Sequence, residues 1–180
     1  MTSVEIRPAT PADLAAITEI YNDVIATTTA VFSLAPSTLA ERRAWFEART
    51  AAGFPVLVAQ HALAVIGFAS FGEFRTWPGY RYSVEHTVHV HREHRGQGAG
   101  SSLVRALFPL AGALGKHVML GGIDAANTGS LRMHQRLGFQ QVAHFHEVGR
   151  KFGRWLDLVF VERWIPLGQF VTTSAASASA

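Results

Sequence analysis

The chain of 180 residues contains no cysteine. This absence excludes disulfide bonds, thiolate zinc sites and a cysteine nucleophile. The sequence also lacks an apolar run close to the ~18 residues that a membrane-spanning helix requires. Its first residues carry no apolar segment of the kind found in signal peptides. From these absences we expect a cytoplasmic protein without a membrane partner.

Charge is scarce as well, and it is nearly balanced. Lysine and arginine number 16 against 13 aspartates and glutamates, a net charge of +3 that predicts no nucleic-acid partner. Fourteen of the 16 cations are arginines, whose planar fork suits phosphate and carboxylate groups. The composition therefore favours a small anionic ligand, bound by a well-packed globule in which 48% of the residues are hydrophobic.

Several chemical motifs are missing too. The chain has no Gly-Lys-Ser/Thr phosphate loop, no H-E-x-x-H metal motif and no G-x-S-x-G nucleophile elbow. His89, His91 and His94, with Glu93 between them, are the nearest approach to a set of metal ligands. Without either a cysteine or the metal motif, we expect no metal.

Composition changes only near the end of the chain. Residues 172–180 consist of threonine, serine and alanine, which cannot form a packed core. We expect one domain over residues 3–168 and a disordered tail over residues 169–180.

Strand and helix patterns alternate along the domain. Thr10-Pro11-Ala12-Asp13 and Thr38-Leu39-Ala40-Glu41 are typical of helix starts, because a hydroxyl cap precedes an acidic third position. Pro109 is expected to kink or destabilise the helix that contains it. The alternation predicts an α/β (α+β) fold with helices on both faces of a sheet. Strands are expected near Ile6 and over 55–59, 64–71, 82–90, 117–121, 141–148 and 155–164, and helices after Thr10, after Thr38, and over 101–114 and 128–137.

The strongest local signal lies between a predicted strand and a predicted helix, in the run Arg95-Gly96-Gln97-Gly98-Ala99-Gly100. Its glycines let the backbone approach a ligand, and the free N–H groups of the following helix favour an anion such as a pyrophosphate. A flexible glycine turn without a ligand is the alternative interpretation.

The same run, as Arg95-x-x-Gly98-x-Gly100, resembles the motif of the GCN5-related N-acetyltransferases, the GNAT superfamily. A second block, from Asn127 to Phe139, resembles that superfamily's Asn-x-x-Ala-x-x-x-Tyr-x-x-x-Gly-Phe segment. Within the superfamily the chain is similar to the phosphinothricin and methionine sulfoximine (or methionine sulfone) N-acetyltransferases. The narrower match rests on residues 20–22, 28–30, 77–81, 84–88, 115–119 and 148–157.

The resemblance implies a fold and a co-substrate. The fold is a mixed sheet of about seven strands, with a splay between its two central parallel strands. Acetyl-CoA lies in that splay, where β-strand backbone binds the pantetheine arm and the glycine loop binds the pyrophosphate. The alternative for Asn127 is a helix cap. The implied cofactor-binding residues are Val88, His89, Val90, Arg95, Gly96, Gln97, Gly98, Ala99, Gly100, Ser101 and Asn127.

Acyl transfer to an amine needs a base, an oxyanion donor and a leaving thiolate. Glu85 is the candidate base, because a carboxylate within a β-branched strand is costly to bury without a reason; a strand glutamate paired with an arginine is the alternative. His86 competes for this role but lies on the opposite strand face. A backbone N–H near Val88 is the candidate oxyanion donor. His134 stands where the superfamily often has its tyrosine acid, and it either donates a proton or only hydrogen-bonds the sulfur; the alternative is a thiolate that leaves without help.

The resemblance also implies an acceptor and its contacts. We expect the acetyl group to pass directly to the α-amino group of a small amino acid analogue, of the methionine sulfoximine, methionine sulfone or phosphinothricin kind. Phe32 either covers this pocket or is a plain core aromatic. A homodimer is expected. The alternatives are another amine (a polyamine, an aminoglycoside or a protein N-terminus) or a non-catalytic acyl-CoA-binding module. The implied substrate contacts are Arg75, Thr76, Trp77, Glu85, His86 and Thr87.

Overall fold

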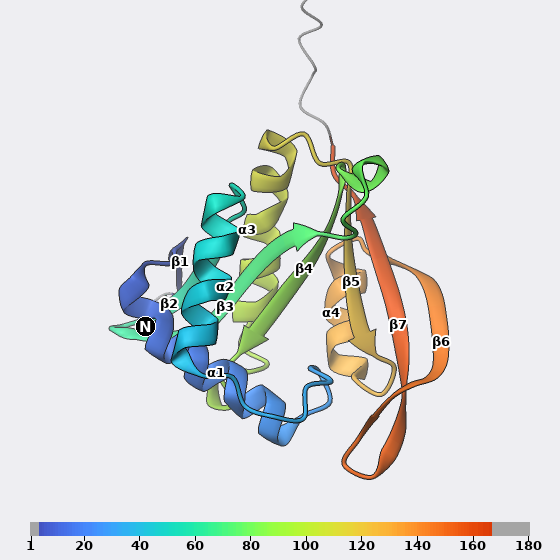
Figure 1. Ribbon diagram of the computed structural model, residues 1–180, viewed down its shortest axis with the longest axis horizontal. Helices are drawn as coiled ribbons and strands as arrows, with labels where there is room; N and C mark the ends of the chain where they lie inside the picture. Colours follow the sequence, from blue (N-terminus) through green and yellow to red (C-terminus); the bar gives the residue numbers. More distant parts are fainter. Residues whose placement is uncertain (1–3, 167–180) are drawn as a thin grey trace, which may run out of the picture.

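Seven strands form one mixed sheet in the computed structural model, which describes residues 4–166 (Figure 1). The strand order is β1-β2-β3-β4-β5-β7-β6, and every neighbouring pair is antiparallel except β4 and β5. The predicted tail, residues 169–180, lies outside the described residues. The strands are β1 (Glu5–Pro8), β2 (Val56–His61), β3 (Ala64–Glu73), β4 (Ser83–Val90), β5 (Val118–Asp124), β6 (Gln140–Lys151) and β7 (Arg154–Trp164).

Helices cover both faces of this sheet, as the sequence predicts. One face packs against α1 (Leu14–Thr27) and α2 (Leu39–Ala51), and the other against α3 (Ala99–Ala113) and α4 (Thr128–Arg136). Helix α3 continues through Pro109. Three 3-10 turns complete the set: η1 (Pro11–Asp13), η2 (Pro78–Tyr80) and η3 (Arg92–His94).

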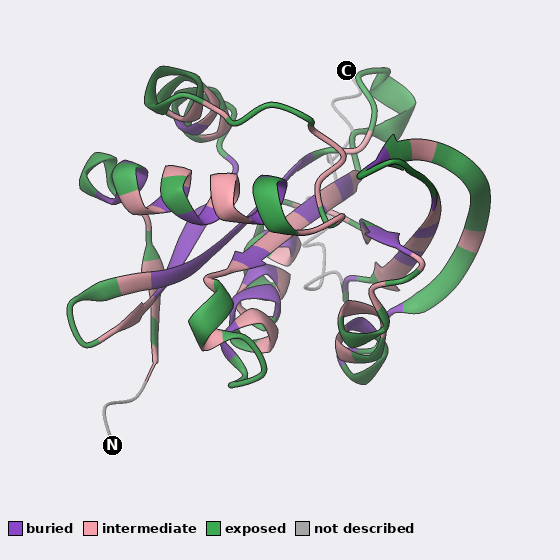
Figure 2. Ribbon diagram, turned by 90° about the horizontal axis from the view of Figure 1, so that it is seen from below, coloured by how far each residue is buried: buried purple, intermediate pink, exposed green. Residues whose placement is uncertain are grey.

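The two faces hold separate hydrophobic cores, because alternate side chains of a strand point to opposite sides. Phe68 of β3 faces α1 and α2, where it packs with Ile17 and Phe46. Its neighbour Phe71 faces α3, where it packs with Leu103. Figure 2 shows the buried central strands between partly exposed helices. Residues of β4 follow the same alternation, which decides where the candidate catalytic side chains point.

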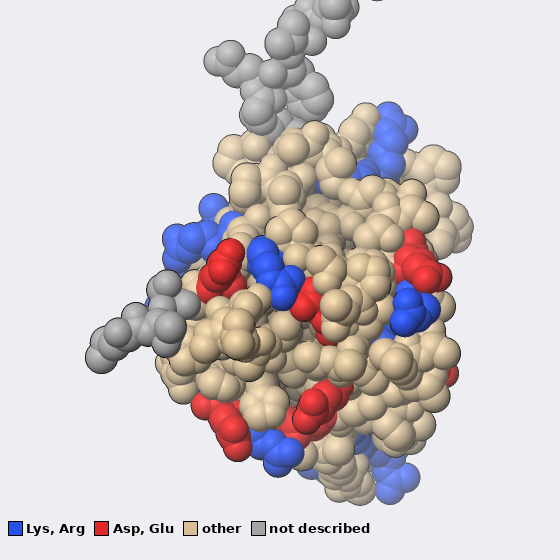
Figure 3. Space-filling view, turned by 90° about the vertical axis from the view of Figure 1, so that its left-hand side faces the viewer, with Lys and Arg blue, Asp and Glu red and all other residues tan. Residues whose placement is uncertain are grey.

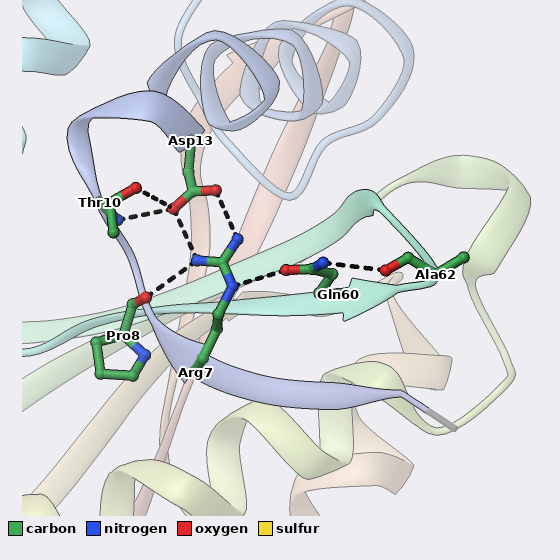
Figure 4. A network of polar contacts seen from close by, with 6 residues as sticks. All are labelled: Arg7, Pro8, Thr10, Asp13, Gln60 and Ala62. Carbon is green, nitrogen blue, oxygen red and sulfur yellow. Dashed lines mark hydrogen bonds and ion pairs between the residues drawn. The ribbon is translucent and has the colours of Figure 1, made fainter. Parts of the chain in front are cut away.

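The start of α1 is fixed to the sheet by a polar network (Figure 4). The carboxylate of Asp13 accepts hydrogen bonds from the backbone of Thr10 at 2.7 Å and from both terminal nitrogens of Arg7 at 2.8 Å. Arg7 also donates to Gln60 of β2 at 2.7 Å. The hydrogen bonds from Arg7 outweigh burial and lower the pKa of Asp13 to about 2. The predicted start at Thr38 is confirmed, because Thr38 and Glu41 hydrogen-bond reciprocally.

Strands β4 and β5 pair only over a short stretch. Ser83 to Glu85 align with Val118 to Leu120, and no later residue of β4 pairs with β5 among the described residues. Figure 1 shows the two strands diverging beyond this point. The predicted splay between the central parallel strands is therefore present, and one edge of β4 is left free for a ligand.

The hairpin of β6 and β7 closes the sheet and curves away from it (Figures 1 and 2). A bulge interrupts the pairing between Phe145 and Gly149. The carboxylate of Asp157 supports this bulge by accepting a hydrogen bond from the backbone of Glu147 at 2.9 Å, which lowers the pKa of Asp157 to about 2. Large apolar side chains are exposed along the hairpin: Val142, Phe145, Val148, Phe152 and Trp155.

Two properties of the surface bear on the predicted partners. Within residues 4–166, none of the helices has the length and apolar character needed to cross a membrane. Figure 3 shows basic and acidic side chains interspersed over the side of the molecule that lies at the left in Figure 1.

Candidate active site

The glycine loop connects η3 to α3 in a conformation that only glycine adopts without strain. Gly96 and Gly98 have φ angles of +76° and +92°, and a Cβ at either position would meet no atom within 4 Å. These two glycines are therefore required by backbone conformation and not by lack of space. Gly98 caps α3, so the free N–H groups of the first helical turn face the loop.

A cavity of about 830 Å³ extends from this loop along β4 to the start of α4. Nine of the eleven predicted cofactor-binding residues line it. The other two do not: Gln97 folds back to donate to the carbonyl of Glu93 at 3.1 Å, and Ala99 is buried in the core. The lining predicted residues are Val88, His89, Val90, Arg95, Gly96, Gly98, Gly100, Ser101 and Asn127.

Asn127 is a helix cap, and its position also leaves it open to the cavity, so its contact with the cofactor stays a prediction. Its side chain caps α4 by accepting a hydrogen bond from the backbone of Ser130 at 3.1 Å, and the residue also lines the cavity. Arg95 lines the cavity too, but its guanidinium is turned toward Asp23 of α1, at 3.4 Å. Asp23 also pairs with Arg92 at 2.9 Å.

Three further arginines line the cavity and were missed in the sequence. Arg132 and Arg136 lie one turn apart on α4, and Arg154 begins β7. The i, i+4 spacing of two cations on a helix was the available signal. Planar guanidinium groups at these positions could bind phosphate oxygens.

Glu85 stands at the last β4–β5 pair before the strands separate, on the sheet face that α1 and α2 cover. Its Oε1 lies over Gly122 of β5, 3.4 Å from where a Cβ would be. Burial raises the pKa of Glu85, while the nearby charges of Arg75 and Arg49 oppose that rise. A carboxylate in this setting binds a proton more readily than an exposed one does.

His86 points to the opposite face, as the strand period predicts. Its ring lies over Gly121, where a Cβ would be only 2.5 Å from Cε1. The adjacent glycines of β5 thus make room for two adjacent side chains of β4, one on each face of the sheet. No pattern in the sequence indicates that Gly121 contacts His86 or that Gly122 contacts Glu85.

His86 and His134 form a buried pair, with 2.9 Å between their Nε2 atoms. Nδ1 of His86 donates to the carbonyl of Leu120 at 2.7 Å. Burial lowers the pKa of His86 to about 3 and also lowers that of His134. Nδ1 of His134 donates to the backbone carbonyl of Ser130 at 2.8 Å and also lies 3.3 Å from the Ser130 hydroxyl.

This arrangement places His134 behind the cavity and not on its wall. His134 is 2% exposed, whereas Ser130 lines the cavity directly. The Ser130 hydroxyl, 3.3 Å from Nδ1 of His134, offers a route for a proton between His134 and the cavity. Sequence reasoning identified His134 but missed Ser130.

The predicted acceptor contacts form two groups. Arg75, Thr76 and Trp77 are exposed on the connection from β3 to β4, and the guanidinium of Arg75 lies 4.3 Å from the ring centre of Phe74. Glu85, His86 and Thr87 lie on β4, where Thr87 is within 2.9 Å of Nε2 of His89.

The segment after α1 forms another wall of the cavity and is held at several points. Its end is fixed by two hydrogen bonds of 2.8 Å between Asn22 and Ser37. Thr29 donates to Asp124, and the buried Lys151 donates to the carbonyl of Val31 at 2.6 Å.

Phe32, in the same segment, packs on the β6–β7 hairpin. Its ring lies over Gly149, where a Cβ would be 2.4 Å from the ring atoms. The ring is half-buried and is not among the residues that line the cavity.

Within residues 4–166, His89, His91 and His94 do not form a group that could share a metal ion, although the ring centres of His91 and His94 lie 5.9 Å apart. His89 is buried against Tyr21 and Phe68, and burial lowers its pKa to about 4. A different group comes together on the hairpin, where His144 and His146 contact one oxygen of Asp157 at 2.8 and 3.0 Å. These three side chains are close enough to share a metal ion, but the two hydrogen bonds to Asp157 already explain why they lie together. The absence of a metal stays a prediction.

Comparisons with known proteins agree with this geometry. A family model described as an acetyltransferase (GNAT) domain matches residues 3–140. The L-amino acid N-acyltransferase MnaT of Escherichia coli is 48% identical over 159 residues, which are 88% of this chain and 92% of that protein. An L-methionine sulfoximine/L-methionine sulfone acetyltransferase of Pseudomonas paraeruginosa is 47% identical over 161 residues, 89% of this chain and 94% of that protein.

A solved structure extends the comparison to three dimensions. The phosphinothricin acetyltransferase of Sinorhizobium meliloti, crystallised in complex with acetyl-CoA, superimposes with a TM-score of 0.89. It is 36% identical, and the match covers 94% of this chain and 91% of that one.

Proposed function

The chain belongs to the GNAT acetyltransferase family, and on this premise we propose that it acetylates the α-amino group of a small amino acid. The acetyl donor is acetyl-CoA, and the acceptor is of the methionine sulfoximine, methionine sulfone or phosphinothricin kind. One observation carries the proposal: the carboxylate of Glu85 is buried over Gly122 where β4 and β5 separate, three residues before Val88, where β4 begins to line the cavity.

The cavity suits acetyl-CoA as a consumed substrate. Its glycine loop and helix start offer backbone N–H groups to a diphosphate, and the free edge of β4 offers an extended backbone to an amide-containing arm. Arg132, Arg136 and Arg154 add cations for further phosphate oxygens. Together these groups direct the thioester end toward Glu85.

Glu85 acts as the general base, directly or through a water molecule. The attacking amine nitrogen must lose its proton, and a carboxylate whose pKa is raised by burial accepts that proton more readily. The nitrogen then forms a bond to the thioester carbon, and the carbon–sulfur bond breaks. A backbone N–H near Val88, on the free edge of β4, stabilises the oxyanion that develops between these events.

The departing thiolate takes up a proton at the other face of β4. We assign His134 to this step as the residue that orients and exchanges a proton with the hydroxyl of Ser130, which lies on the cavity wall. His86 holds His134 in place through the contact between their Nε2 atoms. Base and acid thus lie on opposite sides of one strand.

The acceptor enters from the side of Arg75 and Trp77. Arg75 is exposed and close enough to Glu85 for its charge to oppose the rise in the carboxylate's pKa. A guanidinium there suits a sulfoximine, sulfone or phosphinate oxygen at the far end of the acceptor. The aromatic ring of Trp77 would bound this end of the pocket.

We further propose that the protein acts as a homodimer. The exposed apolar side chains of Phe145, Val148, Phe152 and Trp155 along the hairpin support a contact between copies. The cytoplasmic location and the lack of a nucleic-acid partner stay predictions.

The proposal is tested by measuring release of free thiol from acetyl-CoA with a panel of amines. We expect turnover with methionine sulfoximine, methionine sulfone and phosphinothricin, and mass spectrometry should find the acetyl group on the α-nitrogen. Turnover of spermidine or an aminoglycoside, without turnover of any amino acid, would refute the acceptor. Binding of acetyl-CoA without turnover of any amine would favour a non-catalytic module.

A further inference from the structure

Arg49 crosses the sheet face on which Glu85 lies. It extends from the last turn of α2, and its Nη1 lies 1.1 Å from where a Cβ of Gly72 would be. Gly72 is a buried residue of β3. Any side chain at Gly72 would therefore displace the guanidinium, so the glycine serves as a seat for Arg49.

This seat lies beside the candidate base. Gly72 and Glu85 are directly opposite each other in the β3–β4 pairing. Directly opposite residues of an antiparallel pair have Cβ positions ~5 Å apart on the same face. A guanidinium at the Cβ position of Gly72 is thus within reach of the Glu85 carboxylate and of any group bound beside it.

Arg49 lies near two carboxylates, since the charges of Glu85 and Glu73 act on it, but it is bonded to neither. Residues 4–166 give its side chain no hydrogen bond and no ion pair, although it is half-buried. Other arginines differ: Arg42 donates to Ser37, and Arg7 pairs with Asp13. Burying N–H donors without hydrogen-bond partners is costly unless a ligand completes their contacts.

We propose that Arg49 binds the α-carboxylate of the acceptor amino acid, an inference that rests on the proposed function. In an α-amino acid a single carbon separates the amine from the carboxylate. When the amine lies at Glu85, the carboxylate must lie close to the same point. Arg49 is the cation seated there, and its five N–H donors include the two that a carboxylate takes up in parallel.

The two arginines near Glu85 therefore have different tasks. Arg75 is exposed on a connection, stacked on Phe74, and suits the variable end of the acceptor. Arg49 is anchored in a helix and seated on Gly72, so it suits the group that every amino acid shares. Arg49 decides whether the enzyme accepts an amino acid or a simple amine.

The test compares methionine sulfone with 3-(methylsulfonyl)propylamine, the same molecule without its carboxylate. In Arg49→Gln we expect kcat/KM to fall about 10²-fold for methionine sulfone, since charge-assisted hydrogen bonds are lost. The value for the amine should stay nearly unchanged. Gly72→Ala retains Arg49 but displaces its guanidinium. It should therefore also lower kcat/KM for methionine sulfone more than kcat/KM for the amine. Arg43→Gln, an exposed position on the same helix, is the matched control and should change neither value.

Two results would overturn the inference. An equal loss for both acceptors would mean that Arg49 acts through Glu85 and does not contact the carboxylate. No loss for either acceptor would remove Arg49 from the site. Acetyl-CoA binding and thermal unfolding, measured in each variant, would expose a general folding defect.

Failure of the proposed function would look different. In that case the wild-type protein would acetylate no amino acid. Calorimetric binding of methionine sulfone to the wild type and to Arg49→Gln would still test the contact, with binding expected only in the wild type. Equal binding to the two proteins would overturn the role of Arg49.

Discussion

The two ends of the proposed active site both depend on glycine, but for different physical reasons. At the cofactor end, Gly96 and Gly98 have positive φ angles and open space around them. At the acceptor end, Gly72, Gly121 and Gly122 lie in strands, and each leaves room for a side chain from elsewhere in the chain. The first kind of glycine shapes the backbone, and the second kind makes space for Arg49, His86 and Glu85.

The difference explains which end can be recognised in a sequence. A backbone conformation is a local property, so its glycines occur close together as a motif. A seat for a distant side chain is set by packing between strands, and its glycines carry no local pattern. The comparison predicts that substitutions of the loop glycines will distort the backbone and weaken acetyl-CoA binding. Substitutions at the acceptor end should displace side chains and lower the rate of acetyl transfer or the stability.

The largest expected effect is at the acceptor end, in Glu85→Gln. Loss of the base should lower kcat/KM about 10²-fold or more, while acetyl-CoA binding stays nearly unchanged. Burial raises the pKa of Glu85 above the ordinary value of 4.5, so kcat/KM of the wild type should rise with pH through that higher pKa as the carboxyl loses its proton. Steady-state pH profiles with methionine sulfone would measure both effects.

The control for this variant is Glu19→Gln, at an exposed position of α1, which should behave as the wild type. A rising limb that persists unchanged in Glu85→Gln would show that another group is the base.

The next effect separates the two glycines of β5. Gly121→Ala places a Cβ 2.5 Å from the buried ring of His86 and should lower the free energy of unfolding by about 2 kcal/mol. Gly122→Ala brings its Cβ to 3.4 Å from Glu85, an ordinary contact distance, so stability should change little. Urea unfolding of both variants measures the difference. Equal destabilisation would contradict the close contact of Gly121 with the His86 ring and the looser contact of Gly122 with Glu85.

A smaller effect is expected in the loop, from Gly98→Ala. An L-residue at a φ of +92° is strained by ~1 to 2 kcal/mol, and relief of that strain should distort the loop. Acetyl-CoA binding measured by calorimetry should weaken about tenfold, with the free energy of unfolding as a second readout. Gly79→Ala, where a Cβ meets nothing and φ is not positive, should bind acetyl-CoA as the wild type does. If both variants bind equally well, the loop does not depend on its backbone conformation.

The smallest effect on activity is expected outside the site, at Asp13, where a substitution should change stability alone. The pKa of Asp13 is lowered from 3.8 to about 2 in the folded state, so its contribution is present above pH 4 and is lost as the pH falls toward 2. Asp13→Asn should cost about 1 to 2 kcal/mol near neutral pH and much less near pH 2. Urea unfolding across this range measures it, and kcat/KM should not change. A cost that does not depend on pH would show that packing, not charge, explains the variant.

The fold could be predicted to a large extent. Hydrophobic periodicity located the strands and helices, and the pattern around Gly98 located a loop that lines the cavity. Arg49 could not be predicted, because its position depends on how α2 crosses β3, and Gly72 looks like any other strand glycine. Ser130 was missed for a similar reason, since the burial of His134 behind it follows from the packing of α4 on the sheet.

The segment between α1 and α2 is held by residues that lie far along the chain. The ammonium group of Lys151 binds the carbonyl of Val31, and Gly149 admits the ring of Phe32. A change at either hairpin position would reshape the rim of the cavity without replacing any residue that contacts the acceptor through its own side chain. New acceptor preferences could thus evolve through the hairpin while the catalytic strand stays constant.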